Sequence, residues 1–506
     1  MKVKSQVMRD FHLPKVSPFK TQNFEVLIGA ARVLGETFEM NIREVLKTGG
    51  FKLAKHFCHQ DTKTQAQILY PLKTLQKEET MKRLLLTLFI CLFASTAWAN
   101  TYDYPFVNAY NATVLGTPDL YAAPLPKKVR SKMLELTVFE DRDIPAAFWY
   151  QNKLRYSLVY QKKKAPLIFV IAGTGASFYS SKMLMLQEAF YQAGFHVISL
   201  SSPTHPNFIV TASTTSVPGL SLDDSRDLYR VMELAWQQVK RRIEVSEFYL
   251  TGYSLGAAEA AFVSKLDEDK RTFNFKKVLM INPPVNLLNS VTILDQLLVE
   301  NIPGGLNNFD AFYERLMGRF AEIYHTMGHI DFTDDFLYQV AKRFPPKDYV
   351  LEALIGFSFR ISSANMVFTS DVMTKAGYIV PKSETLTTPT SLTDYAKVSF
   401  RISFVDYFNG LFYPHFAAKN TGLTKEALVE SISLKSIEGY LRGAEKIGLV
   451  TNEDDIILAE GELDYLRQVF GSRAKIYVKG GHCGNMAYTD NITHMIDFFK
   501  DEGVVK

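Results

Sequence analysis

The sequence predicts an α/β protein with a doubly wound, mainly parallel sheet and a large helical cap insertion. Two apolar, β-rich runs, at 167–172 and 277–282, have the length and composition of strands buried on both faces, as in parallel sheets. Segments of helical pattern alternate with such strands, which is typical of this fold class. From 283 to 444 the alternation stops, and a largely helical pattern rich in Phe, Tyr, Leu and Met takes its place.

The predicted elements describe a core interrupted by one insertion. The first core part covers 130–282, the helical cap covers 283–444, and the second core part covers 445–506. A structureless loop as long as the insertion does not belong in a compact domain, so we interpret it as a cap, with a separate domain as the alternative. In chain order the predicted strands are 133–139, 155–160, 167–172, 196–200, 247–250, 277–282, 447–451 and 474–478, and the predicted core helices include 181–193, 221–242 and 491–499.

The composition is that of a soluble globular protein, with 47% hydrophobic and 22% charged residues in a chain of 506. This length suits one large domain with insertions, or two to three ordinary domains. The formal net charge of +4 is small for the length. It gives no reason to expect nucleic acid or an acidic polymer as a partner.

Residues 81–99 have the three parts of a secretory signal peptide. They begin with a basic MKR, continue with a short apolar run and end in the small-residue cleavage box AWA. A bilayer span takes about 20 apolar residues, so the run is short for a transmembrane helix. We therefore expect export to the periplasm or the medium, with Asn100 as the first mature residue. Retention of 84–98 as a membrane anchor is the alternative.

A signal peptide at this position makes residues 1–80 an uncertain N-terminal extension, which we interpret as a start-site overcall. The three cysteines are Cys58, Cys91 and Cys483. Only Cys483 would remain after cleavage, so we expect no internal disulfide.

The motif GYSLG at 252–256 is a G-x-S-x-G sequence in which Ser254 follows a predicted strand and precedes the Ala-rich start of a helix. At such a tight turn the serine hydroxyl projects above the sheet, and the flanking glycines avoid collisions between the turn and its neighbours. The motif alone is weak, but the strand before it and the helix after it are the required context. Ser254 is therefore the candidate nucleophile.

A serine hydroxyl needs a base to remove its proton. His482 lies in the loop GGHCG, directly after the predicted strand 474–478, from which it can reach the serine. A carboxylate that orients the imidazole is expected in the loop after 447–451, where both Asp454 and Asp455 are candidates. The spacing from the strand favours Asp455, and Asp454 remains the alternative acid.

Negative charge that develops on a substrate carbonyl needs backbone N–H donors. We expect one from Leu255, directly after the nucleophile, and a second from Thr174, which follows the first glycine of Gly173-Thr174-Gly175 after the strand 167–172. A nucleotide-binding loop is the other interpretation of this Gly-x-Gly, but the third glycine of such a motif is missing.

These motifs, over about 130–500, resemble those of the α/β-hydrolase superfamily. The Asp454-Asp455 pair and the Gly-Gly-His sequence before Cys483 are similar to those of its monoacylglycerol-lipase-like esterase branch. The resemblance implies cleavage of an ester, thioester or amide through an acyl-enzyme, without a metal or an organic cofactor. Ala172 stands where the family often has a histidine. Asn282 stands where some relatives place the acid, and an asparagine cannot act as one.

We therefore expect an exported serine hydrolase that cleaves a carboxylic ester with an apolar or lipid-like acyl group. A peptidase or thioesterase of the same fold, or a non-catalytic envelope binding protein, are the alternatives. The expected partner is a small-molecule or lipid ester, with no nucleic acid and with contact to a membrane surface as an open option. Nothing in the sequence sets an oligomeric state.

Overall fold

An eight-stranded sheet forms the centre of the protein in the computed structural model. The structure describes residues 102–126, 129–309, 311–312, 314 and 347–500. All of these from Tyr104 onward belong to one compact unit. The predicted extension 1–80 and the predicted signal peptide 81–99 lie outside the described residues.

The strand order is β1-β2-β4-β3-β5-β6-β7-β8, so the sheet is doubly wound, as the sequence predicts. The first two strands pair antiparallel with their neighbours, and the six strands from β4 to β8 run parallel. The strands are β1 (Lys132–Leu136), β2 (Leu154–Val159), β3 (Ala165–Ile171), β4 (His196–Leu200), β5 (Val245–Tyr253), β6 (Val278–Ile281), β7 (Ile447–Asn452) and β8 (Ala474–Tyr477). Parallel strands place their carboxyl ends at one edge, where loops can meet to form a site.

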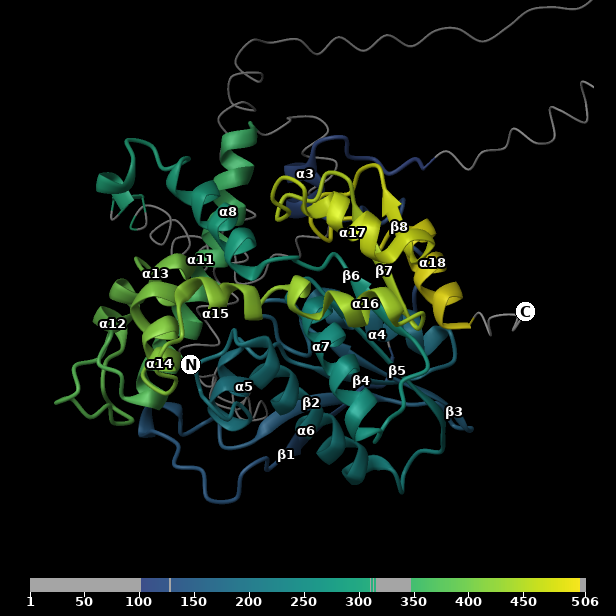
Figure 1. Cartoon of the computed structure of the whole chain (residues 1–506), viewed down its shortest axis with the longest axis horizontal. Helices are drawn as coiled ribbons and strands as arrows, with labels where there is room; N and C mark the ends of the chain where they lie inside the picture. Colours follow the sequence, from purple (N-terminus) through teal and green to yellow (C-terminus); the bar gives the residue numbers. More distant parts are fainter. Residues whose placement is uncertain (1–101, 127–128, 310, 313, 315–346, 501–506) are drawn as a thin grey trace, which may run out of the picture. The chain divides into compact units, whose positions relative to one another are not determined.

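Helices cover the sheet and bury its apolar side chains. The largest apolar cluster joins side chains of β3, β5 and β6 to those of α6 and α7. The core helices are α4 (Ser181–Gln192), α6 (Ser221–Val239), α7 (Leu255–Lys270), α17 (Glu462–Phe470) and α18 (Thr489–Lys500). Asp223 and Asp224 lie in the first turn of α6, where carboxylates suit the positive end of the helix dipole. Figure 1 shows the order of the elements along the chain.

Two short helices were not expected from the sequence. Helix α3 (Ala109–Leu115) lies before the first strand, and α5 (Pro206–Thr211) follows β4. The ring of His205 accepts a hydrogen bond from the N–H of Asn207 and so caps α5. Short 3₁₀ turns add Ala146–Phe148 to the first core part and Gly471–Arg473 to the second.

The cap lies between β6 and β7 in the chain, and its described part is mainly helical, as predicted, with one isolated β-bridge between Asn286 and Ser433. Its aromatic and aliphatic side chains form a cluster of their own, which extends to Ile209 and Val210 of α5 in the core. The described cap elements are α8 (Leu287–Val299), a 3₁₀ turn (Leu306–Asn308), α11 (Asp348–Thr374), α12 (Thr393–Ser399), α13 (Phe404–Tyr407), a π-helical segment (Phe408–Phe412), α14 (Tyr413–Ala417), α15 (Lys425–Ser431), a 3₁₀ turn (Leu434–Ile437) and α16 (Glu438–Gly443).

Within the described residues, α11 is the one helix with the length and apolar character of a membrane span. Its most apolar 18-residue window has a mean hydropathy of 1.2, and 78% of that window is buried inside the protein. The helix packs against α8, α3 and α5, as expected of a buried central helix of the cap.

Candidate active site

Ser254 lies at the tight turn between β5 and α7, in a backbone conformation that few residues adopt. Its φ is 54° and its ψ is −127°. The flanking glycines have physical reasons to be there. A Cβ on Gly252 would come within 2.2 Å of the Gly256 carbonyl oxygen, and a Cβ on Gly256 within 2.3 Å of the Ile171 carbonyl oxygen. The turn therefore requires glycine at both positions, and it holds the serine above the carboxyl edge of the sheet.

His482 reaches the serine from the loop that follows β8. Its Nε2 lies 2.9 Å from the Oγ of Ser254, at hydrogen-bonding distance. Both side chains are almost fully buried, with 6% of His482 and 7% of Ser254 exposed. The structure therefore brings together the predicted nucleophile and the predicted base.

The two candidate acids have different partners. One carboxylate oxygen of Asp455 lies 2.9 Å from Nδ1 of His482. The carboxylate of Asp454 instead accepts hydrogen bonds from the N–H groups of Gly480 and Gly481, at 3.1 and 2.8 Å. The geometry thus favours Asp455 as the acid. Asp454 fixes the start of the histidine loop, a role that the sequence did not indicate.

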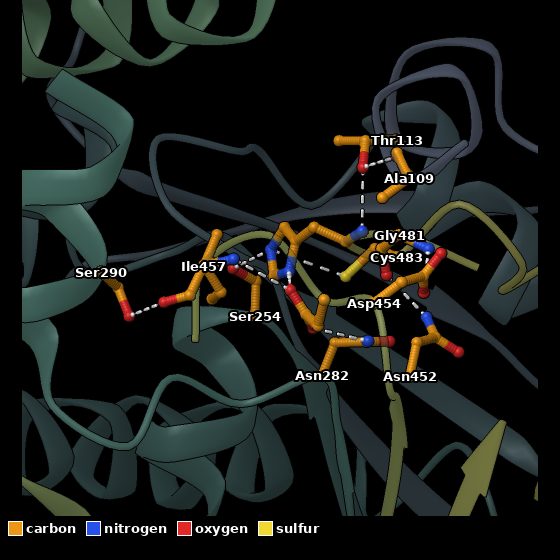
Figure 2. A network of polar contacts seen from close by, with 12 residues as sticks. Ala109, Thr113, Ser254, Asn282, Ser290, Asn452, Asp454, Ile457, Gly481 and Cys483 are labelled. Atoms are coloured by element: carbon orange, nitrogen blue, oxygen red, sulfur yellow. Dashed lines mark hydrogen bonds and ion pairs between the residues drawn. The ribbon is translucent and has the colours of Figure 1, made fainter. Parts of the chain in front are cut away.

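Further donors hold the Asp455 carboxylate (Figure 2). The N–H of Ile457 donates to Oδ1 at 3.2 Å, and the side-chain amide of Asn282 donates to Oδ2 at 2.8 Å. Ser290, on the cap helix α8, donates its hydroxyl to the carbonyl oxygen of Ile457 at 2.8 Å. The acid loop is therefore held both from the end of β6 and from the cap.

Helix α3 holds the histidine loop from the other side. The Oγ1 of Thr113 accepts a hydrogen bond from the N–H of His482 at 2.9 Å and donates one to the carbonyl oxygen of Ala109 at 2.7 Å. In Figure 2 Thr113 and Asn282 approach the network from opposite sides. No motif identifies α3, so this contact could not be predicted from the sequence.

The predicted oxyanion donors lie at the two expected loops. Leu255 opens α7, where the first-turn N–H groups of a helix have no intrahelical acceptor. In the loop after β3 the N–H of Gly175 donates to Oγ1 of Thr204, and that of Ala176 donates to the Gly173 carbonyl oxygen. Within the described chain the N–H groups of Thr174 and Leu255 donate to no other group. Both therefore remain available to a ligand.

Two neighbouring side chains act on His482 from within the site. Burial opposes the charged imidazolium, but electrostatic interaction with Cys483 and with Asp455 outweighs it and raises the pKa of His482 above its ordinary value. The sulfur of Cys483 lies 3.8 Å from the Nε2 of His482, and Cys483 is itself buried. A raised pKa makes the imidazole a stronger proton acceptor once it is neutral, and it also extends the acidic range in which the imidazole is protonated and cannot act as a base.

Helices α6 and α7 carry a second pair of buried carboxyls, Asp224 and Glu259. Glu259, on α7, has no exposed surface, and neither of its carboxyl oxygens has a hydrogen-bond partner within the described chain. Burial, and then the charge of Asp224 on α6, raise the pKa of Glu259 well above its ordinary value. Across the residues the structure describes, no group of three or more His, Cys, Asp or Glu side chains is arranged to hold a metal ion.

The fold is that of the α/β-hydrolases, as the strand order, the parallel crossovers and the serine at the turn after β5 show. No protein-family model matches the sequence, and no curated protein matches it.

Similar solved structures include an esterase from the fungus Rhizomucor miehei, with 12% identity, a TM-score of 0.36 and coverage of 74% of this chain and 85% of that one. An esterase from Pyrobaculum calidifontis has 14% identity, a TM-score of 0.35 and coverage of 78% and 92%. A thioesterase domain from the curacin biosynthetic pathway has 12% identity, a TM-score of 0.32 and coverage of 74% and 100%. Similarities at this level say nothing about the substrate.

Proposed function

We propose that the protein is a serine hydrolase that cleaves a carboxylic ester through an acyl-enzyme on Ser254. The observation that carries this proposal is one continuous chain of two hydrogen bonds. It runs from the Ser254 hydroxyl to Nε2 of His482 and from Nδ1 of His482 to Asp455, at 2.9 Å each. A buried hydroxyl, imidazole and carboxylate in this order can activate the hydroxyl as a nucleophile.

In the proposed mechanism His482 accepts the Ser254 proton while Oγ attacks the ester carbonyl. Asp455 keeps the proton of the imidazole on Nδ1 and stabilises the imidazolium that forms. The N–H groups of Thr174 and Leu255 donate to the carbonyl oxygen as it gains negative charge. His482 then gives its proton to the leaving alcohol. Water, deprotonated by the same histidine, releases the acid and restores Ser254.

An apolar acyl group suits the surroundings of the site. Ile457, two residues after the acid, packs in a cluster with Leu294 of α8 and Ile355 of α11, and Phe359 packs against the same cluster. Helix α11 also touches the loop of the oxyanion donors, because a Cβ on Gly175 would lie 2.6 Å from the hydroxyl of Ser362. Apolar side chains of the cap therefore lie beside the acid loop, where a lipid-like acyl chain could be accommodated, and a serine of α11 lies beside the oxyanion loop.

Export is part of the proposal and rests on the sequence pattern of 81–99. The mature enzyme would begin at Asn100 and act in the periplasm or the medium. N-terminal sequencing of the protein recovered from outside the cytoplasm tests this directly. Recovery of the chain only with 84–98 attached to membranes would support an anchored form instead.

The test of the activity is labelling with a fluorophosphonate probe, beside Ser254→Ala. We expect the native protein to be labelled and the variant not to be. Ser225→Ala, which changes another buried serine on α6, should be labelled like the native protein and serves as the matched control. A p-nitrophenyl ester series of rising chain length then measures the acyl preference. Folded native protein that neither reacts with the probe nor cleaves an ester would favour a non-catalytic binding protein.

A further inference from the structure

The second oxygen of the acid has a donor of its own. Oδ1 of Asp455 faces the imidazole and the N–H of Ile457, whereas Oδ2 accepts from the side-chain amide of Asn282 at 2.8 Å. Asn282 follows the last residue of β6 and has no exposed surface. Its own N–H donates to the Val450 carbonyl oxygen at 2.7 Å, so its backbone is fixed to β7.

Two features of Asn282 are unfavourable for the stability of the folded protein. Its φ is 49°, in the left-handed region that residues other than glycine adopt rarely. Its side-chain oxygen is buried and has no hydrogen-bond partner within the described chain. An unpartnered buried polar atom and a left-handed backbone each oppose folding, so the residue must serve a purpose other than stability.

We propose that Asn282 is a positioning residue, which holds the Asp455 carboxylate so that Oδ1 faces Nδ1 of His482. This inference rests on the proposed function. The Asn282 amide fixes the orientation of the carboxylate because it donates a hydrogen bond to Oδ2 from a fixed position. Without it, Oδ2 would be a buried acceptor with no donor among the described residues, and the carboxylate could rotate to bring either oxygen to the N–H of Ile457. A donor on each oxygen removes that freedom.

Position 282 needs a residue that both tolerates the left-handed backbone and donates a hydrogen bond, and asparagine does both. Glycine adopts the same backbone conformation without strain but has no amide. Aspartate tolerates the conformation, but its carboxylate would face the Asp455 carboxylate with two acceptors and no donor. These two substitutions therefore separate the backbone role of position 282 from its donor role.

The experiment compares Asn282→Gly and Asn282→Asp with the native protein in p-nitrophenyl ester hydrolysis from pH 6 to pH 9. For Asn282→Gly we expect kcat to fall about 10- to 100-fold at every pH, with KM within about twofold, because only the acid is affected. Thr451→Val is the matched control. It also changes a fully buried side chain, at the end of β7, and the hydroxyl it removes has no partner in the described chain. Its kcat should stay within about twofold of the native value.

Asn282→Asp has a signature that a merely structural role would not produce. At acidic pH the two adjacent carboxyls share one proton, and the O–H of residue 282 can donate to Asp455 in place of the amide. As the pH rises that proton is lost, and two carboxylates face each other. The ratio of its kcat to the native kcat should therefore start near one and fall with rising pH. The other titratable groups beside this pair are His482, Asp454 and Cys483, and all three are the same in both proteins.

A native-like kcat for Asn282→Gly, or a pH-independent ratio for Asn282→Asp, would overturn the proposal. Proton NMR of the imidazole separates this failure from a failure of the proposed function, since it needs no turnover. The downfield Nδ1–H resonance of His482 should be present in native protein and weakened in Asn282→Gly. If the native protein cleaves no ester but shows this difference, the positioning role stands and the hydrolase proposal fails. An unchanged resonance would contradict the positioning role whatever the activity.

Discussion

Two buried carboxyl groups, Asp455 in the acid loop and Glu259 on α7, differ in what surrounds them. Asp455 receives hydrogen bonds from a ring nitrogen, a backbone N–H and a side-chain amide. Glu259 is as deeply buried, but neither of its oxygens has a partner in the described chain. Asp455 thus has hydrogen-bond donors that can stabilise a negative charge, whereas Glu259 has none among the described residues.

The comparison shows that burial alone does not determine the role of a carboxyl group. A charge removed from water is tolerated where hydrogen-bond donors replace the water, and otherwise the group takes up a proton. The raised pKa of Glu259, caused by burial and then by Asp224, follows this rule. The donors around Asp455 therefore mark the carboxylate that can stabilise an imidazolium, and Glu259 is a neutral part of the interior.

The largest effect is expected when the carboxylate of Asp455 is replaced by an amide. Asp455→Asn should lower kcat by about 10⁴-fold while the protein stays folded, because an amide neither holds the imidazole in the required tautomer nor stabilises its charge. Glu259→Gln, the matched change at the other carboxyl, should leave kcat within about threefold. Ester hydrolysis and circular dichroism on both variants check this. Equal losses would mean that the two carboxyls act alike, against the comparison.

The second effect concerns pH. Because the pKa of His482 is raised above its ordinary value of 6.5, the base is protonated and inactive at mildly acidic pH. We expect kcat/KM to rise about tenfold per pH unit on the acidic limb and to reach half of its maximum above pH 6.5. Hydrolysis of a neutral p-nitrophenyl ester across pH 5 to 10 gives this midpoint. A midpoint below 6.5 would show that desolvation dominates over the interactions with Cys483 and Asp455.

A smaller effect is expected at the neighbouring aspartate. Asp454→Asn replaces one of two acceptors for the N–H groups of Gly480 and Gly481 by an amide that donates. The histidine loop should loosen, and we expect kcat to fall about tenfold, far less than for Asp455→Asn. Steady-state kinetics of both variants in one assay compare the two positions. The reverse ranking would make Asp454 the acid.

The smallest effect is on stability. The folded protein keeps the proton on Glu259, whereas the unfolded chain releases it above the ordinary pKa of glutamate, near 4.5. The free energy of unfolding should therefore fall as the pH rises, by at most about 1.4 kcal/mol per pH unit for one proton. Glu259→Gln removes this proton release, so its stability relative to the native protein should improve from pH 5.5 to pH 8. Denaturant unfolding at both pH values measures the difference, and a pH-independent difference would contradict a neutral Glu259.

Local patterns predicted the sheet and the nucleophile turn. The strand at 167–172 could be predicted because a continuous run of apolar, β-forming residues indicates a buried strand without any knowledge of its neighbours in the sheet. The structure has β3 there. The doubly wound parallel arrangement and the helical insertion also follow from alternation along the chain. The long helix α11 was not predicted as one element, since it is buried over most of its length and its buried positions include polar residues such as Arg360 and Asp371, which obscures an apolar periodicity.

The partners within the site could not be predicted in the same way. The sequence placed Asp454 and Asp455 one residue apart, and only the hydrogen bonds to the glycine loop and to the imidazole distinguish them. Asn282 was noted as a residue that cannot be the acid, but its contact with Asp455 joins positions 173 residues apart in the chain. Thr113 and Ser290 belong to helices with no motif, and their contacts depend on tertiary packing that spacing does not reveal.

The contact of α3 with the histidine loop also concerns the order in which a ribosome makes the protein. Besides Thr113, the hydroxyl of Thr117 donates to the Gly484 carbonyl oxygen at 2.8 Å, and Ala122 forms a β-bridge with Tyr488. Figure 1 shows α3 beside the C-terminal segment, so the first and last described parts of the chain meet at the site. During translation Ser254 emerges long before His482, and the loop that carries His482 docks on α3, which is made before either of them. A growing chain therefore carries Ser254 without its hydrogen-bond partner until the segment after β8 has been made.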